Sequence, residues 1–215
     1  RKIVELNGVP AEPTVPRVLG PKMCVPFGKI LRGNAIPNTV TKTLHTDKVF
    51  AQDLKSFGIE AFPDDFLTSA DATIRYLRGR YLPDTVYYVC GTESLKNQLR
   101  LAGLRVAETL RDDCAVVLLG YDTELTYEKL ENCCILLNRG VDYVATHPDL
   151  VCPTWYGSAP DCGSVIEMLH TATGRRPKVI GKPQPEMALL AMERTGFSPE
   201  QTVLLEKMDA DVERV

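Results

Sequence analysis

Residues 86–146 decide the fold, and their sequence is VYYVCGTESLKNQLRLAGLRVAETLRDDCAVVLLGYDTELTYEKLENCCILLNRGVDYVAT. Short apolar runs at 86–91, 115–119 and 143–146 are separated by amphipathic runs at 93–102 and 126–138. Apolar strands that alternate with helices of roughly ten residues are typical of α/β proteins with parallel strand pairing. The sequence therefore predicts an α/β fold with a parallel sheet.

The same alternation extends in both directions from this stretch. Further helices are predicted at 48–57, 68–78, 163–173 and 185–195, and further strands at 178–180 and 202–205. Thr68 or Ser69 is the expected N-cap of the second of these helices, because hydroxyl side chains accept hydrogen bonds from free helix N–H groups. In such sheets a ligand binds beyond the carboxyl ends of the strands.

The first 37 residues differ from the rest because they hold six of the fifteen prolines. Proline removes a backbone donor and fixes φ, so this spacing excludes a helix or a long strand. We expect a loosely ordered arm with one short strand. The chain has no initiator Met, so both a fragment and a full gene product stay open as interpretations.

Composition excludes several classes of protein. The 215 residues are 44% hydrophobic and 25% charged, with a net charge of −3, so no basic field would attract nucleic acid. The longest apolar run, 115–120, is far below the roughly 20 residues of a membrane span. We therefore expect no nucleic-acid partner and no membrane partner. The seven cysteines form no CxxC pair, which predicts reduced thiols and a cytoplasmic location.

Two loops at predicted strand ends carry the candidate chemistry. In KVIGKPQP (178–185) Lys182 lies between a strand and a helix N-terminus, an arrangement that suits a phosphate. After the strand at 202–205, three carboxylates occur within six residues, and Mg²⁺ prefers oxygen ligands of this kind. Taken singly, each loop is better explained as an ordinary solvated surface. Together they favour phosphoryl chemistry.

Three stretches carry a resemblance to a known family: VLLGYDTELTYEKL (117–130), VATHPD (144–149) and GKPQPEM (181–187). They are similar to signatures of the NagD-like, or p-nitrophenyl phosphatase-like, branch of the haloacid dehalogenase (HAD) superfamily. The resemblance covers about residues 47–215. It implies an incomplete Rossmann-like HAD core at 1–85 and 177–215, with an inserted α/β cap domain at 86–176.

The family implies Mg²⁺-dependent hydrolysis of small phosphate monoesters through a phospho-aspartate. The substrate would be a small phosphorylated metabolite, and a homodimer would form through the cap. By resemblance Lys182 is the catalytic lysine and binds phosphate. Thr41 is assigned to phosphate binding, and Glu206 and Asp211 to the metal.

The first family motif departs from its pattern. If Gly28 and the run Arg32-Gly33-Asn34 set the register, Val25 occupies the nucleophile position and Phe27 the acid/base position. Valine has no nucleophilic atom and phenylalanine has no titratable proton, so we expect weak activity or none. One helix–strand unit of the core is also missing, which predicts a marginally stable core and a better preserved cap.

Weaker candidates lie in the predicted cap. His147, where the family commonly has Asn, and Asp149 are candidate substrate contacts, although a loop histidine without a catalytic role is the simpler interpretation. Asp161 stands where the family usually has Gly. Trp155-Tyr156 fits a substrate-pocket wall, a dimer face or plain loop packing. His45 and His170 have no partner at metal-ligand spacing and receive no role.

Three hypotheses remain open from the sequence. The first is an active Mg²⁺-dependent phosphatase, which requires a different register at residues 23–34. The second is a non-catalytic relative that binds a phosphorylated ligand or a partner. The third is a degenerate product that keeps the family sequence without its function.

Overall fold

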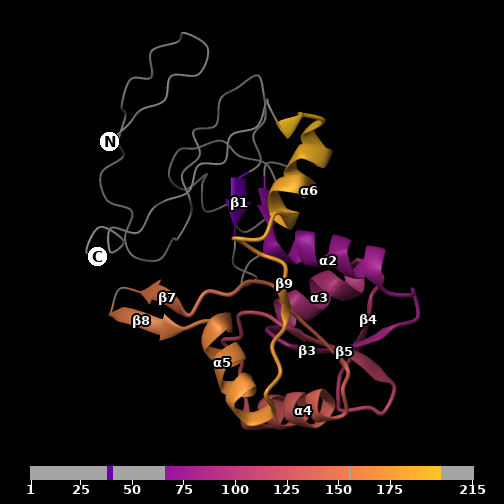
Figure 1. Cartoon of the computed structure of the whole chain (residues 1–215), viewed down its shortest axis with the longest axis vertical. Coiled ribbons are helices and arrows are strands. Elements are labelled where there is room, and N and C mark those ends of the chain that lie inside the picture. Colours follow the sequence, from indigo (N-terminus) through magenta and orange to yellow (C-terminus); the bar gives the residue numbers. More distant parts are fainter. Residues whose placement is uncertain (1–37, 41–65, 155, 200–215) are drawn as a thin grey trace.

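The computed structural model describes residues 38–40, 66–154 and 156–199. Figure 1 shows their strands and helices. The strands are β1 (Asn38–Val40), β2 (Phe66–Thr68), β3 (Val86–Cys90), β4 (Arg105–Ala107), β5 (Cys114–Leu119), β6 (Asp142–Ala145), β7 (Val151–Thr154), β8 (Gly157–Pro160) and β9 (Lys178–Val179). The helices are α2 (Ser69–Arg80), α3 (Glu93–Leu101), α4 (Tyr127–Asn138), α5 (Cys162–Thr173) and α6 (Glu186–Thr195). The predicted α/β class is confirmed.

The main sheet has five strands in the order β4-β3-β5-β6-β9. Every neighbouring pair in it is parallel, so the carboxyl ends of its strands meet at one edge. Two smaller sheets accompany it: β1 pairs with β2 in parallel, and β7 forms an antiparallel hairpin with β8. None of the helices within the described ranges is long and apolar enough to cross a membrane.

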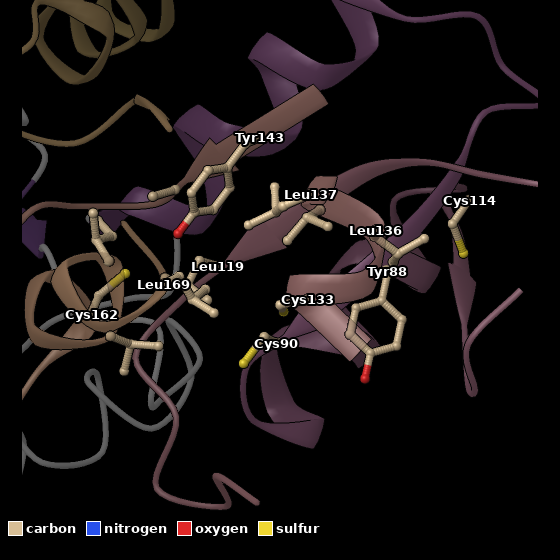
Figure 2. Packing of buried hydrophobic residues seen from close by; sticks show 14 of the residues in the cluster. Tyr88, Cys90, Cys114, Leu119, Cys133, Leu136, Leu137, Tyr143, Cys162 and Leu169 are labelled. Atoms are coloured by element: carbon tan, nitrogen blue, oxygen red, sulfur yellow. The ribbon is translucent and has the colours of Figure 1, made fainter. Parts of the chain in front are cut away.

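Both faces of the main sheet are covered by helices. Figure 2 shows one of the two hydrophobic clusters, where Tyr88 and Cys90 of β3 pack with buried residues of α4 and α5. The alternate residues Tyr87 and Val89 belong to the opposite cluster, which includes residues of α2, α3 and α6. Burial on both faces explains why all five residues of β3 are buried and why its sequence is continuously apolar.

Periodicity predicts most of these elements well. Within the described residues, every predicted helix and strand is confirmed, with ends that differ by no more than two residues. The sequence does not predict β1, β2, β4 or the β7–β8 hairpin. β4 has only three residues, of which only Ala107 is buried, and the hairpin contains two prolines, which argue against strands. The predicted helix at 48–57 and strand at 202–205 lie outside the described residues.

The sheet also bears on the predicted domain boundary between residues 176 and 177. Strand β9 hydrogen-bonds to β6, so residues 178–179 belong to the same sheet as strands from the predicted cap. The chain leaves this sheet at Ile180 and enters α6, which packs against α2 and β2. The division into a core and a cap at residue 176 stays a prediction.

Helix α2 begins with a reciprocal capping box. The backbone N–H of Asp71 donates to Thr68 Oγ1 at 3.2 Å, and the backbone N–H of Thr68 donates to Asp71 Oδ2 at 2.7 Å. These bonds satisfy two donors that a helix N-terminus otherwise leaves free. The structure therefore selects Thr68 over Ser69 as the N-cap.

We expect Thr68→Ala to lower the free energy of unfolding by about 1 kcal/mol, as loss of an N-cap hydroxyl usually does. Urea denaturation followed by circular dichroism measures the change. Thr68→Ser, which keeps the hydroxyl, serves as the control and should retain most of the stability. Equal losses in both variants would show that the methyl group, and not the cap, stabilises this position.

Candidate functional site

The loops that follow β6 and β9 lie against each other at the carboxyl edge of the main sheet. The Ile180 N–H donates to Ala145 O at 3.0 Å, and the Gly181 N–H donates to Thr146 O at 2.8 Å. A Cβ atom at Gly181 would lie 2.5 Å from Thr146 O and 3.0 Å from His147 Cβ. Only glycine permits this close approach. Lys182 therefore directly follows the residue that contacts the loop containing His147.

Lys182 is placed as the sequence predicts, between a strand and a helix N-terminus. It is half-buried, follows β9, and lies four residues before the first residue of α6. The N-cap of α6 is Pro185, which makes no side-chain hydrogen bond to the first turn. Helix N–H groups without a side-chain cap, together with an ammonium group, provide the donors and the positive charge that bind a phosphate.

Three buried polar side chains, those of Thr146, His147 and Asp161, contact one another in sequence, starting in the loop after β6. His147 Nδ1 is 2.8 Å from Thr146 Oγ1, and His147 Nε2 is 2.8 Å from Asp161 Oδ1. Asp161 is the N-cap of α5, and its Oδ1 also accepts the Cys162 N–H at 2.7 Å. The side chains of His147 and Asp161 have no exposed surface. This pair joins the loop after β6 to the start of α5.

The burial of His147 bears on its predicted contact with substrate. Both of its ring nitrogens have partners within the protein, and the side chain is closed to solvent. Asp149, in contrast, is partly exposed, so of these two residues it is the one accessible to a bound molecule. His45 lies outside the described residues, and His170 lies in α5. Substrate contact by His147 stays a prediction that its burial does not favour.

The groups around this pair hold their protons firmly. Burial raises the pKa of the Cys162 thiol, and the neighbouring Asp161 carboxylate raises it further. Burial also raises the pKa of Tyr121 to about 12, with a smaller contribution from Cys152. A thiol with a raised pKa is a weak nucleophile at neutral pH. Neither side chain is therefore suited to nucleophilic attack.

A second charged network, which the sequence does not predict, connects the loop after β3 to the loop after β5. The Lys129 ammonium on α4 donates to Asp122 Oδ2 at 2.8 Å, Glu124 O at 2.9 Å and Gly91 O at 3.2 Å. Asp122 is almost fully buried, with 1% of its side chain exposed. One ammonium group thus satisfies three acceptors from two loops and holds this end of the sheet together.

Several predicted site residues lie outside the described residues. They are Thr41, Glu206 and Asp211, together with Val25 and Phe27 at the positions of the expected nucleophile and acid. Thr41 is the next residue in the sequence after β1. Trp155 is also outside the described residues, whereas Tyr156, at the turn between β7 and β8, is exposed. The structure places Gly181, the neighbour of Lys182, against the loop that contains His147, and the assigned roles of all these residues stay predictions.

Comparison with known proteins shows which family the chain resembles. The family model for haloacid dehalogenase-like hydrolases matches residues 39–105. The acid sugar phosphatase of Staphylococcus haemolyticus (strain JCSC1435) is 34% identical over 171 residues, which are 78% of this chain and 63% of that protein. A solved protein assigned as NagD superposes with a TM-score of 0.71 at 31% identity. The chain belongs to the haloacid dehalogenase superfamily. Within it, the sequence and the superposition place the chain in the NagD-like branch.

The superposition also shows how much of the solved relatives the chain covers. The NagD structure matches 76% of this chain and 63% of that chain. The glycerol phosphate phosphatase of Mycobacterium tuberculosis, solved in complex with magnesium, matches with a TM-score of 0.73 at 29% identity, over 76% of this chain and 50% of that chain. The present chain therefore spans about half to two thirds of these relatives. Its fold combines the Rossmann-like core of the family with the α/β cap.

Proposed function

We propose that this chain is a phosphatase-like protein for small phosphate monoesters, with its phosphoryl-binding site built on Lys182. The observation that carries the proposal is the position of the GKPQPEM segment. Its lysine follows β9 and precedes the N-terminus of α6, which has no side-chain cap. The names of the relatives, an acid sugar phosphatase and a glycerol phosphate phosphatase, support a small phosphorylated metabolite as the ligand.

Magnesium is the cofactor that we propose for this site. Glu206 and Asp211 supply two carboxylates, and oxygen donors of this kind, together with water and a substrate phosphate, form the usual coordination of Mg²⁺. The relative from M. tuberculosis was solved with magnesium, which supports the proposal. Bound Mg²⁺ would screen the negative charge of the phosphoryl group. Thr41 is proposed as a further phosphate ligand.

Val25 and Phe27 determine how much hydrolysis we expect. In the register set by Gly28 and Arg32-Gly33-Asn34, neither residue can form a phospho-aspartate or transfer a proton. We therefore expect this chain to bind a phosphoryl ligand and to hydrolyse it weakly or not at all. The second candidate function, binding without catalysis, is favoured by the same two residues.

The test measures hydrolysis and binding separately on the purified chain. Hydrolysis of p-nitrophenyl phosphate with Mg²⁺ should stay near background, whereas calorimetry should detect binding of inorganic phosphate. Lys182→Ala should weaken that binding at least about 10-fold, because a hydrogen bond to a charged group contributes about 1.5–3 kcal/mol. Lys178→Ala, which removes a lysine that is 44% exposed and paired with Glu186, is the matched control and should bind as the unchanged chain does.

The outcomes separate the candidates. Turnover that Lys182→Ala abolishes would identify an active phosphatase and overturn the register at Val25. Phosphate binding without turnover would support the non-catalytic function. Phosphate affinity equal in the unchanged chain and in Lys182→Ala would remove Lys182 from the site and contradict the proposal.

Two further proposals concern the cellular location and the oligomeric state of the protein. We propose a cytoplasmic protein, because all six cysteines in the described residues are free and five of them are buried. The homodimer through the cap is proposed with the exposed Tyr156 at the hairpin turn as a candidate contact, since aromatic side chains are frequent interface anchors. Light scattering after size exclusion measures the mass, and a monomer at micromolar concentration would contradict the dimer.

A further inference from the structure

Three potential metal ligands converge at the base of the β7–β8 hairpin. They are His147 and Asp149, from the loop after β6, and Asp161, the N-cap of α5. One ligand atom from each residue lies within 4.8 Å of those from the other two. The hairpin, residues 151–160, connects the two sides of this cluster, and the Asp161 N–H donates to Leu150 O at its base at 3.0 Å.

The bonding of Asp161 supplies an independent indication of a ligand. Its Oδ1 lies 2.8 Å from His147 Nε2 and accepts a hydrogen bond from the Cys162 N–H. Its Oδ2 is buried and has no hydrogen-bond partner among the described residues. A buried carboxylate oxygen without a partner is costly, and buried charges are usually paired or bound to metal. The unpartnered oxygen belongs to the same carboxylate whose other oxygen meets His147, so one of the three potential ligand residues has an unused coordinating atom.

We propose that His147, Asp149 and Asp161 bind a first-row divalent transition metal such as Zn²⁺ or Co²⁺. None of these three residues belongs to the magnesium site proposed on Glu206 and Asp211, and the inference does not depend on the proposed function. One imidazole with two carboxylates suits transition metals better than Mg²⁺, which favours oxygen ligands alone. Three protein ligands leave a coordination position for water. Asp149 is the partly exposed member of the three.

The residues around the cluster orient each ligand. Thr146 Oγ1, 2.8 Å from His147 Nδ1, can accept a hydrogen bond from the Nδ1–H tautomer, which leaves Nε2 to bind the metal, the usual support of a metal-binding histidine. The Cys162 N–H fixes Asp161. The Gly163 N–H donates to Asp149 O at 2.7 Å and fixes the backbone of the third ligand. The ligands are therefore held in place before the metal binds.

Titration of the chelator-treated full chain with Co²⁺, in excess Mg²⁺ to occupy the core site, tests the proposal. We expect one equivalent of Co²⁺ to bind, with an absorption spectrum of nitrogen and oxygen ligands and without the intense near-ultraviolet band of thiolate ligation. Asp149→Asn should weaken this binding at least 10-fold. Asp112→Asn, which removes a carboxylate with 98% of its side chain exposed, is the matched control and should bind as the unchanged chain does.

Two further variants keep the test decisive. His147→Asn removes the imidazole and should also abolish binding, but it leaves Asp161 buried without its partner, so its folding is checked by circular dichroism. The double variant Glu206→Gln/Asp211→Asn should keep the Co²⁺ site, which separates this site from the core. Unchanged Co²⁺ affinity in folded Asp149→Asn, or a spectrum of thiolate ligation, would overturn the proposal.

Discussion

Lys129→Met is expected to destabilise the protein by about 3–5 kcal/mol, the usual cost of removing one partner from a buried ion pair. Asp122 would keep its negative charge with 1% of its side chain exposed, and Lys129 itself is only 16% exposed. The carbonyl oxygens of Gly91 and Glu124 would lose their charged donor at the same time. Methionine fills a similar volume, so the loss comes from the charge and its hydrogen bonds. Urea denaturation with two-state analysis measures it.

Lys178→Met is the matched control for this prediction. Lys178 also forms an ion pair, at 2.9 Å with Glu186, but its side chain is 44% exposed. Exposed pairs contribute about 0–1 kcal/mol, so the control should lose less than about 1 kcal/mol. Similar losses of unfolding free energy in the two variants would show that burial does not strengthen the Lys129–Asp122 pair. A loss below about 1 kcal/mol in Lys129→Met would mean that water reaches Asp122.

The contrast between these two lysines shows what the sequence could predict. Local signals are visible in it: Thr68, one of the two predicted N-cap residues of α2, caps that helix, and Gly174 ends α5 in the left-handed conformation. The contact between Lys129 and Gly91 spans 38 positions and depends on the order of strands in the sheet. No periodicity or capping pattern contains that order, so the network becomes visible only in three dimensions.

The candidate site shows the same division. Lys182 is predicted at the end of a strand because the strand, the glycine and the proline-rich turn are consecutive in sequence. His147 and Asp161 are each visible as departures from the family pattern, where Asn and Gly are usual. Their side chains meet at 2.8 Å because the chain between them folds back as the β7–β8 hairpin, which the sequence does not predict. The signal that could have predicted this contact is that both departures from the family pattern lie close to the ends of the same segment, residues 151–160.

Gly163→Ala is expected to destabilise the protein by about 3 kcal/mol, at the upper end of the usual range for overpacking. A Cβ atom at this position would lie 2.2 Å from Pro148 O and 2.7 Å from Asp149 O, and both are backbone atoms that cannot rotate away. Relief requires that α5 and the loop after β6 separate, which breaks the bond from the Gly163 N–H to Asp149 O. Thermal unfolding followed by circular dichroism measures the loss.

Gly79→Ala provides the comparison that makes this result interpretable. Gly79 lies on the exposed side of α2, and a Cβ atom there would have no neighbour within 4 Å. Alanine in a helix is favoured over glycine by about 0.5–1 kcal/mol, so this variant should be more stable than the unchanged chain. Opposite signs for the same substitution would show that close packing requires glycine at 163. If Gly163→Ala were as stable as the unchanged chain, α5 and the His147 loop would not be rigidly joined. A metal site shared between them would then lack the fixed geometry that the distances indicate.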